Sequence, residues 1–166
     1  MAELNLHQRI ENFQDMGGIL PKVPASITDN LNPAFRLRPY QEEALRYLLY
    51  YLEDYPHREY PSQLLFHMAT GSGKTLIMAA TILHLYQQGY RNFIFFVHLD
   101  NIIRKTRDNF LNAQSSKYLF APIVKINGQP VSVSPVHNFQ AVSDDDINIV
   151  FNTIQGLHSP LNNPRE

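Results

Sequence analysis

Residues 63–75 read QLLFHMATGSGKT, and this stretch decides the fold. Its first six residues, 63–68, form a short apolar run bounded by turn residues, which is the pattern of a strand buried on both faces. The remainder fits the motif G-x-x-x-x-G-K-S/T, except that Met68 stands at the position of the first glycine. The motif requires a strand before it and a helix after it, and the following residues predict that helix over 75–88.

A loop of this composition is built to hold phosphate. Gly71 and Gly73 allow backbone conformations closed to other residues, so that successive N–H groups converge on an anion. The predicted helix begins near Lys74 and directs its positive end to the same place. We expect a nucleotide here, ATP with Mg²⁺, with Lys74 and Thr75 as the catalytic residues: Lys74 reaches the β- and γ-phosphates, and the Thr75 hydroxyl coordinates the metal. The expected nucleotide-binding residues of the loop are Thr70, Gly71, Ser72, Gly73, Lys74 and Thr75.

Predicted helices and strands alternate on either side of the loop. Pro39 suits a first helical position, and apolar residues then recur at helical spacing until Tyr55, which precedes a proline. Asp100 is expected to cap a later helix, and a small hairpin is expected around 131–133. Further strands are predicted over 93–97, which we expect to be buried, 123–126 and 147–153. Apolar strands between helices indicate an α/β fold, a three-layer domain with a mainly parallel sheet.

Composition limits the remaining possibilities. The 166 residues carry a formal net charge of −1, so they lack the basic excess of many free-standing nucleic-acid binders. The sequence contains no cysteine, which excludes disulfides and cysteine-ligated zinc within it. No apolar run approaches the roughly 18 residues of a membrane span, and the N-terminus does not resemble a secretory signal. We therefore expect a cytoplasmic protein without a membrane contact.

The first 35 residues differ in character from the rest. Residues 1–35 are rich in proline, asparagine and small polar residues, which predicts an irregular N-terminal arm with one short helix. Residues 36–166 would then form the domain proper. They end in NNPRE without a closing helix or strand, so we expect the domain to be incomplete at that end.

The segment FRLRPYQEEAL, residues 35–45, lies about 30 residues before the loop. It resembles the glutamine motif of superfamily 2 helicases. In that family the glutamine reads adenine, and an amide side chain can pair with both hydrogen-bonding edges of that base. The resemblance implies that Gln41 selects adenine and that Arg38 or Tyr40 stacks on the base. The alternative is a surface helix start in which Gln41 only faces water.

The longer segments narrow the resemblance. LRPYQEEAL, MATGSGKT, FIFFVHLDNIIRKTRDNF and INIVFNTIQGLHSPLNN together resemble the Res subunit of type III restriction enzymes, with the R subunit of type I systems as a relative. The likeness covers roughly residues 33–166. It implies a RecA-like domain, an ATP-driven motor on duplex DNA, a nuclease elsewhere in the protein, and a modification or specificity subunit as partner.

The resemblance also implies contacts with the DNA backbone. Many superfamily 2 members have a proline and a glutamine where this chain has His98 and Lys105, so the assignment departs from the family pattern at both places. The competing interpretations are solvated charges on an amphipathic helix and an ordinary loop after a strand. The candidate contacts are His98, Arg104, Lys105, Arg107, Thr153 and Gln155.

Hydrolysis of ATP needs groups that this stretch does not supply. The family provides a D-E-x-x box at a strand end and arginines from a second RecA-like domain. Residues 144–146 (DDD) precede a predicted strand and are interpreted as a solvated turn. We therefore expect these 166 residues alone to hydrolyse no more ATP than a Lys74→Ala variant.

Three other functions remain open at this point. The first is another superfamily 2 helicase acting in DNA repair or on RNA. The second is a small-molecule kinase or a GTPase, although the guanine-reading motif N-K-x-D is absent from the sequence. The third is a non-catalytic nucleotide-binding scaffold.

Overall fold

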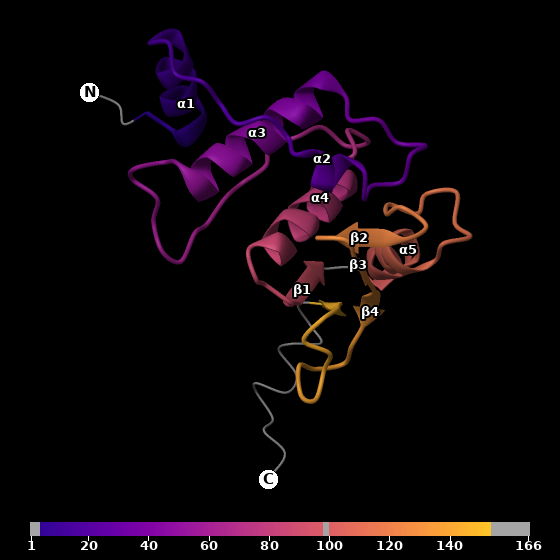
Figure 1. The fold of residues 1–166 in the computed structure, drawn as a ribbon. Coiled ribbons are helices and arrows are strands. Elements are labelled where there is room, and N and C mark those ends of the chain that lie inside the picture. Colours follow the sequence, from indigo (N-terminus) through magenta and orange to yellow (C-terminus); the bar gives the residue numbers. More distant parts are fainter. Residues whose placement is uncertain (1–3, 98–99, 154–166) are drawn as a thin grey trace.

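The computed structural model describes residues 4–97 and 100–153 (Figure 1). Its helices are α1 (Leu6–Asp15), α2 (Ala25–Thr28), α3 (Pro39–Glu53), α4 (Lys74–Gln87) and α5 (Asp100–Leu111). Its strands are β1 (Asn92–Val97), β2 (Val124–Ile126), β3 (Gln129–Val131), β4 (Val133–Pro135) and β5 (Ile147–Thr153). Among these residues, no helix has the length and apolar character needed to cross a bilayer.

A parallel sheet of order β1-β5-β4 organises the domain. β1 pairs with β5 along its whole length, from Asn92 opposite Asn148 to Val97 opposite Thr153. β4 flanks β5 on the other edge, also in parallel. Parallel neighbours need a crossover, and α5 lies in the connection that leads from β1 back to the sheet. The α/β class with a parallel sheet, part of a RecA-like domain, is confirmed.

Helix α5 packs on the sheet through an aromatic cluster. Phe110 of α5 is fully buried and lies 6.3 Å from the Phe95 ring and 6.1 Å from the Phe151 ring, measured between centroids. The Phe120 ring approaches the Phe110 ring edge-on, with 5.6 Å between their centroids. Such tilted arrangements suit the ring quadrupoles and add about 0.5–1.5 kcal/mol per pair to the burial of apolar area. Most apolar side chains of α4, among them Leu76, Ile77 and Leu83, belong to the same core, which fixes the loop before α4 relative to the sheet.

The predicted strand over 63–68 is wrong for the described structure. These residues run without strand assignment, and Leu64, Phe66 and Met68 pack against the core while Leu65 is 91% exposed. A strand needs a hydrogen-bonded neighbour, and none pairs with this segment in the described part of the chain. The apolar composition of residues 63–68 predicts that one face is buried, but it does not predict whether another strand lies beside them.

The expectation that β1 is buried is also wrong. Its burial alternates, with Ile94 52% exposed and Phe96 41% exposed. The side chains of Phe93 and Phe95 pack against the core from the other face. A sequence of five consecutive apolar residues does not distinguish a covered face from an open one, because strand propensity and burial favour the same residue types.

The hairpin lies earlier in the sequence than predicted. β2 and β3 form an antiparallel pair, separate from the parallel sheet, around Asn127 and Gly128 with φ of 54° and 79°. Positive φ at both turn residues is the geometry of a two-residue type I′ turn, and Asn-Gly is its strongest sequence signal. Val131 therefore ends β3, and Val133 begins β4 in the main sheet.

The N-terminal segment carries two helices rather than one and packs on the domain. Ile27 and Leu31 are buried in the main core. The Asn30 amide donates to the carbonyls of Ser26 and Lys125, both at 2.8 Å, and its oxygen accepts from the Lys125 N–H. These contacts join the segment to the region of β2, far along the chain.

Helices α3 and α4 meet at a buried histidine that predicts a pH-dependent stability. His84 lies 3.6 Å from the Glu53 carboxylate; burial lowers the pKa of His84, and Glu53 partly opposes this. The unfolded state, with a pKa near 6.5, therefore binds the proton more readily than the folded state. We expect the free energy of unfolding to fall as the pH drops below about 6.5, over the window between the two pKa values. Urea unfolding at pH 7.5 and 5.5 measures the effect. The His84→Gln variant should show a smaller change in the free energy of unfolding between the two pH values. The control variant His137→Gln, at an exposed site, should show the same change as the unaltered protein. The prediction is contradicted if this change is equal in the unaltered protein and both variants.

Candidate nucleotide-binding site

The loop before α4 has the backbone of a phosphate cradle. Gly71 and Gly73 have φ of +80° and +82°, in the left-handed region that favours glycine. No atom lies within 4 Å of the position that a Cβ of Gly71 would take, so that side of the loop is open. Ser72 lies between these glycines, and its N–H donates to the Ala69 carbonyl at 3.3 Å.

The N-terminus of α4 faces this loop with unsatisfied donors. Gly73 is the N-cap of this 14-residue helix and offers no side chain to cap it. Leu76 and Ile77 donate their N–H groups to the Gly73 carbonyl. Within the described residues, the N–H groups of Lys74 and Thr75 have no protein acceptor. Free donors at the positive end of a helix dipole bind anions, and phosphate is the anion that this geometry fits.

Lys74 lies folded over the loop. Its Nζ donates to the carbonyls of Met68 and Ala69, at 2.9 and 2.8 Å. An ammonium has three donors, so this lysine keeps one donor for another acceptor. Thr75, in the first turn of α4, is half-buried beside it. The chemistry of this set, backbone donors with one ammonium and one hydroxyl, fits a nucleotide phosphate with Mg²⁺.

The start of α3 contacts this loop directly. Gln41 is only 4% exposed; its Nε2 donates to the Ser72 carbonyl at 2.8 Å and its Oε1 accepts from the Arg38 N–H at 2.9 Å. The Tyr40 hydroxyl donates to the same Ser72 carbonyl at 2.9 Å, and the Arg38 guanidinium donates to that hydroxyl at 3.3 Å. The structure thus brings Arg38, Tyr40 and Gln41 to the phosphate loop. Their contacts with a base stay a prediction.

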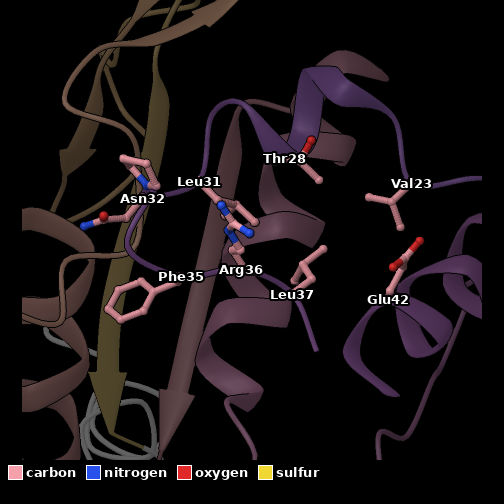
Figure 2. A pocket seen from close by; sticks show the side chains of 9 residues that line it. Val23, Thr28, Leu31, Asn32, Phe35, Arg36, Leu37 and Glu42 are labelled. Carbon is pink, nitrogen blue, oxygen red and sulfur yellow. The ribbon is translucent and has the colours of Figure 1, made fainter. Parts of the chain in front are cut away.

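A hollow of about 290 Å³ lies beside the same segment (Figure 2). Apolar residues such as Leu31 and Leu37 line it together with the oppositely charged Arg36 and Glu42. The lining residues are Val23, Thr28, Leu31, Asn32, Pro33, Phe35, Arg36, Leu37 and Glu42. Most of these precede the glutamine segment, so the N-terminal arm builds this hollow. Sequence reasoning missed it, since a Pro- and Asn-rich segment carries no signal for the surface it packs against.

The structure places only part of the predicted DNA-contact set. Arg104, Lys105 and Arg107 are exposed on α5. Thr153 ends β5, where its N–H donates to the Asn152 side chain at 2.8 Å. Val97 is its register partner, so the carboxyl ends of β1 and β5 share one edge of the sheet. His98 and Gln155 lie outside the described residues.

The acidic run 144–146 forms the turn before β5. The carbonyls of Asp144 and Asp145 accept from the Arg91 guanidinium and the Tyr86 hydroxyl, at 2.8 and 2.6 Å. The Asp146 carboxylate accepts from the Ser132 N–H at 3.2 Å. Residues 144–146 thus stabilise the fold through these hydrogen bonds, and they are far in sequence from the phosphate loop. Across residues 4–97 and 100–153, no three acidic or histidine side chains group as metal ligands.

The chain is similar to a known protein family and to one of its named members. The family described as "Type III restriction enzyme, res subunit" matches residues 34–166. The "Probable type III restriction-modification enzyme HindVIP Res subunit" of Haemophilus influenzae is 40% identical over 116 residues, which are 69% of this chain and 22% of that protein. The chain therefore spans about a fifth of the length of this curated relative. No solved structure matches the chain.

Proposed function

The chain belongs to the family of the Res subunits of type III restriction enzymes, and from this premise we propose that it is the ATP-binding portion of an ATP-dependent DNA helicase or translocase. In this proposal residues 36–166 are the N-terminal part of the first RecA-like domain, which residues 1–35 precede as an arm. The observation that supports the proposal is the loop before α4, where two N–H groups without a protein acceptor among the described residues lie at the helix start beside the Lys74 ammonium.

ATP would be held by its phosphates at this loop. The N–H groups of Lys74 and Thr75 would bind phosphate oxygens, and Lys74 would exchange the carbonyls of Met68 and Ala69 for the β- and γ-phosphates. The Thr75 hydroxyl would coordinate Mg²⁺, which neutralises charge as the terminal phosphate leaves. Thr70, on the exposed turn before Gly71, would close the loop on the phosphates.

Adenine would be selected by the glutamine segment. One amide hydrogen of Gln41 is used on the Ser72 carbonyl and one lone pair of its oxygen on Arg38, so a second hydrogen and a second lone pair remain. This pair of groups matches N7 and the exocyclic amine of adenine, which guanine does not present together. Arg38 and Tyr40 are exposed next to it and supply planar groups for stacking on the base.

The partner would be duplex DNA, together with a modification subunit. The relative from Haemophilus influenzae is named as a subunit of a restriction-modification enzyme. Arg104 and Lys105, which are exposed on α5, would contact phosphates of the DNA backbone. Thr153, at the end of β5, would contact the same backbone. Such contacts position a motor on DNA without reading its sequence.

The test is ATP hydrolysis by the protein expressed from its complete reading frame. We expect turnover that duplex DNA stimulates, that GTP does not replace, and that the Lys74→Ala variant lacks. Stimulation by RNA alone would favour an RNA helicase instead. Hydrolysis of ATP and GTP at equal rates would contradict the role of Gln41, and the absence of any turnover would contradict the motor.

A further inference from the structure

Two side chains of α3 hold one carbonyl of the phosphate loop. The Ser72 oxygen accepts from the Tyr40 hydroxyl at 2.9 Å and from Gln41 Nε2 at 2.8 Å. A carbonyl has two lone pairs, and both are thereby used. This is the carbonyl between the two glycines of the loop, and the donors come from residues about 30 positions earlier in the sequence.

The direction of this carbonyl determines what the loop offers to an anion. In a trans peptide the C=O and the following N–H point in opposite directions. A Ser72 carbonyl directed at α3 therefore turns the Gly73 N–H away from α3. If this peptide unit rotated, the carbonyl oxygen would take the place of that donor and repel a phosphate. This rotation changes ψ of Ser72 and φ of Gly73, which is +82°, and a glycine at position 73 meets little steric resistance to it.

Resting on the proposed binding of a nucleotide at this loop, we propose that Tyr40 is a positioning residue, whose hydroxyl holds the Ser72 carbonyl and so keeps the loop in its phosphate-binding form. Arg38 donates to the same hydroxyl at 3.3 Å. A cationic donor polarises the hydroxyl and makes it a better donor to the carbonyl. The hydrogen bonds from Arg38 to Tyr40 and from Tyr40 to Ser72 thus hold the loop in a fixed position relative to α3. This role depends on the oxygen of Tyr40, whereas stacking on a base depends on its ring.

Tyr40→Phe separates these two roles, because phenylalanine keeps the ring and loses the hydroxyl. The matched control is Tyr90→Phe, at an exposed tyrosine in the turn between α4 and β1. Calorimetric titration measures two probes, MgATP and inorganic tripolyphosphate, which has phosphates but no base. We expect Tyr40→Phe to weaken both probes by the same factor, about three- to tenfold, the usual effect of one lost hydrogen bond. Tyr90→Phe should bind both as the unaltered protein does.

Other outcomes overturn the proposal in distinguishable ways. Tyr40→Phe that binds both probes normally shows that the hydroxyl does not position the loop. A loss confined to MgATP shows that Tyr40 acts on the base and not on the phosphate loop. A fall in melting temperature that accounts for a loss in both probes shows a general role in folding. If the unaltered protein binds neither probe better than Lys74→Ala does, the nucleotide site itself is refuted along with this inference.

Discussion

Lys74→Ala is expected to reduce ATP hydrolysis by the complete protein about a hundredfold or more, to the level of the assay blank. The ammonium of Lys74 is the only side-chain cation among the residues of the loop, 69–75. Negative charge is redistributed over the β- and γ-phosphate oxygens as the bond to the terminal phosphate breaks, and a fixed cation there lowers the barrier. Steady-state hydrolysis at saturating ATP, with titration of MgATP beside it, measures both the chemical step and the binding.

A lysine of the exposed turn after α5 supplies the control for this prediction. Lys117→Ala removes the same charge at a site away from the loop, and we expect it to leave hydrolysis within about twofold of the unaltered protein, as most surface substitutions do. Lys74 binds two carbonyls of the loop, so its removal also frees those acceptors. Thermal melting with and without MgATP therefore belongs to the experiment. Hydrolysis by Lys74→Ala at the rate of Lys117→Ala would locate the chemistry elsewhere.

The sequence predicts the parts of the fold that one periodic segment determines by itself. Helix α3 begins at Pro39 as expected, α4 lies within one residue of its predicted range 75–88, and α5 begins at Asp100, the residue expected to cap it. Their apolar residues repeat at the helical period, and the start signals are local. The same holds for β5, which spans the predicted 147–153.

The errors concern features that depend on a neighbour. Residues 63–68 have the composition of a buried strand, yet in the described part of the chain no strand pairs with them. Ile94 and Phe96 are as apolar as Phe93 and Phe95, and only the packing of other elements decides which of them are covered. These are tertiary facts, and no local pattern contains them.

The candidate site likewise has features that the local sequence predicts and contacts that it does not predict. The motif itself predicts the loop, its glycines and the helix that follows, because the backbone chemistry of phosphate binding dictates the residue types. The resemblance to a family pointed to Gln41 and assigned it to adenine. The contacts of Gln41 and Tyr40 with Ser72 were not predicted, since they join segments about 30 residues apart. Nothing in the sequence around Tyr40 predicts that its hydroxyl donates a hydrogen bond to the Ser72 carbonyl.

Gly73→Ala and Gly71→Ala form a matched pair with unequal expected effects. Both glycines have φ near +80°, so alanine costs about 1–2 kcal/mol of backbone strain at either position. At Gly71 the new methyl group meets no atom within 4 Å, and strain is the whole effect. At Gly73 it would lie 2.3 Å from Gln41 Nε2, which is buried and bonded to the Ser72 carbonyl. Alanine at position 73 must therefore displace Gln41 from the loop and lose its hydrogen bonds as well.

We expect Gly73→Ala to weaken MgATP binding about tenfold more than Gly71→Ala does, since displacing Gln41 costs about one to two further hydrogen bonds. A double-mutant cycle with Gln41→Ala assigns the cause, because the shorter side chain leaves room for the new methyl group. The cost of Gly73→Ala should then shrink toward that of Gly71→Ala when Gln41 is already alanine. Full additivity of Gly73→Ala and Gln41→Ala would show that the glutamine does not restrict position 73, and that strain in the loop alone explains the loss.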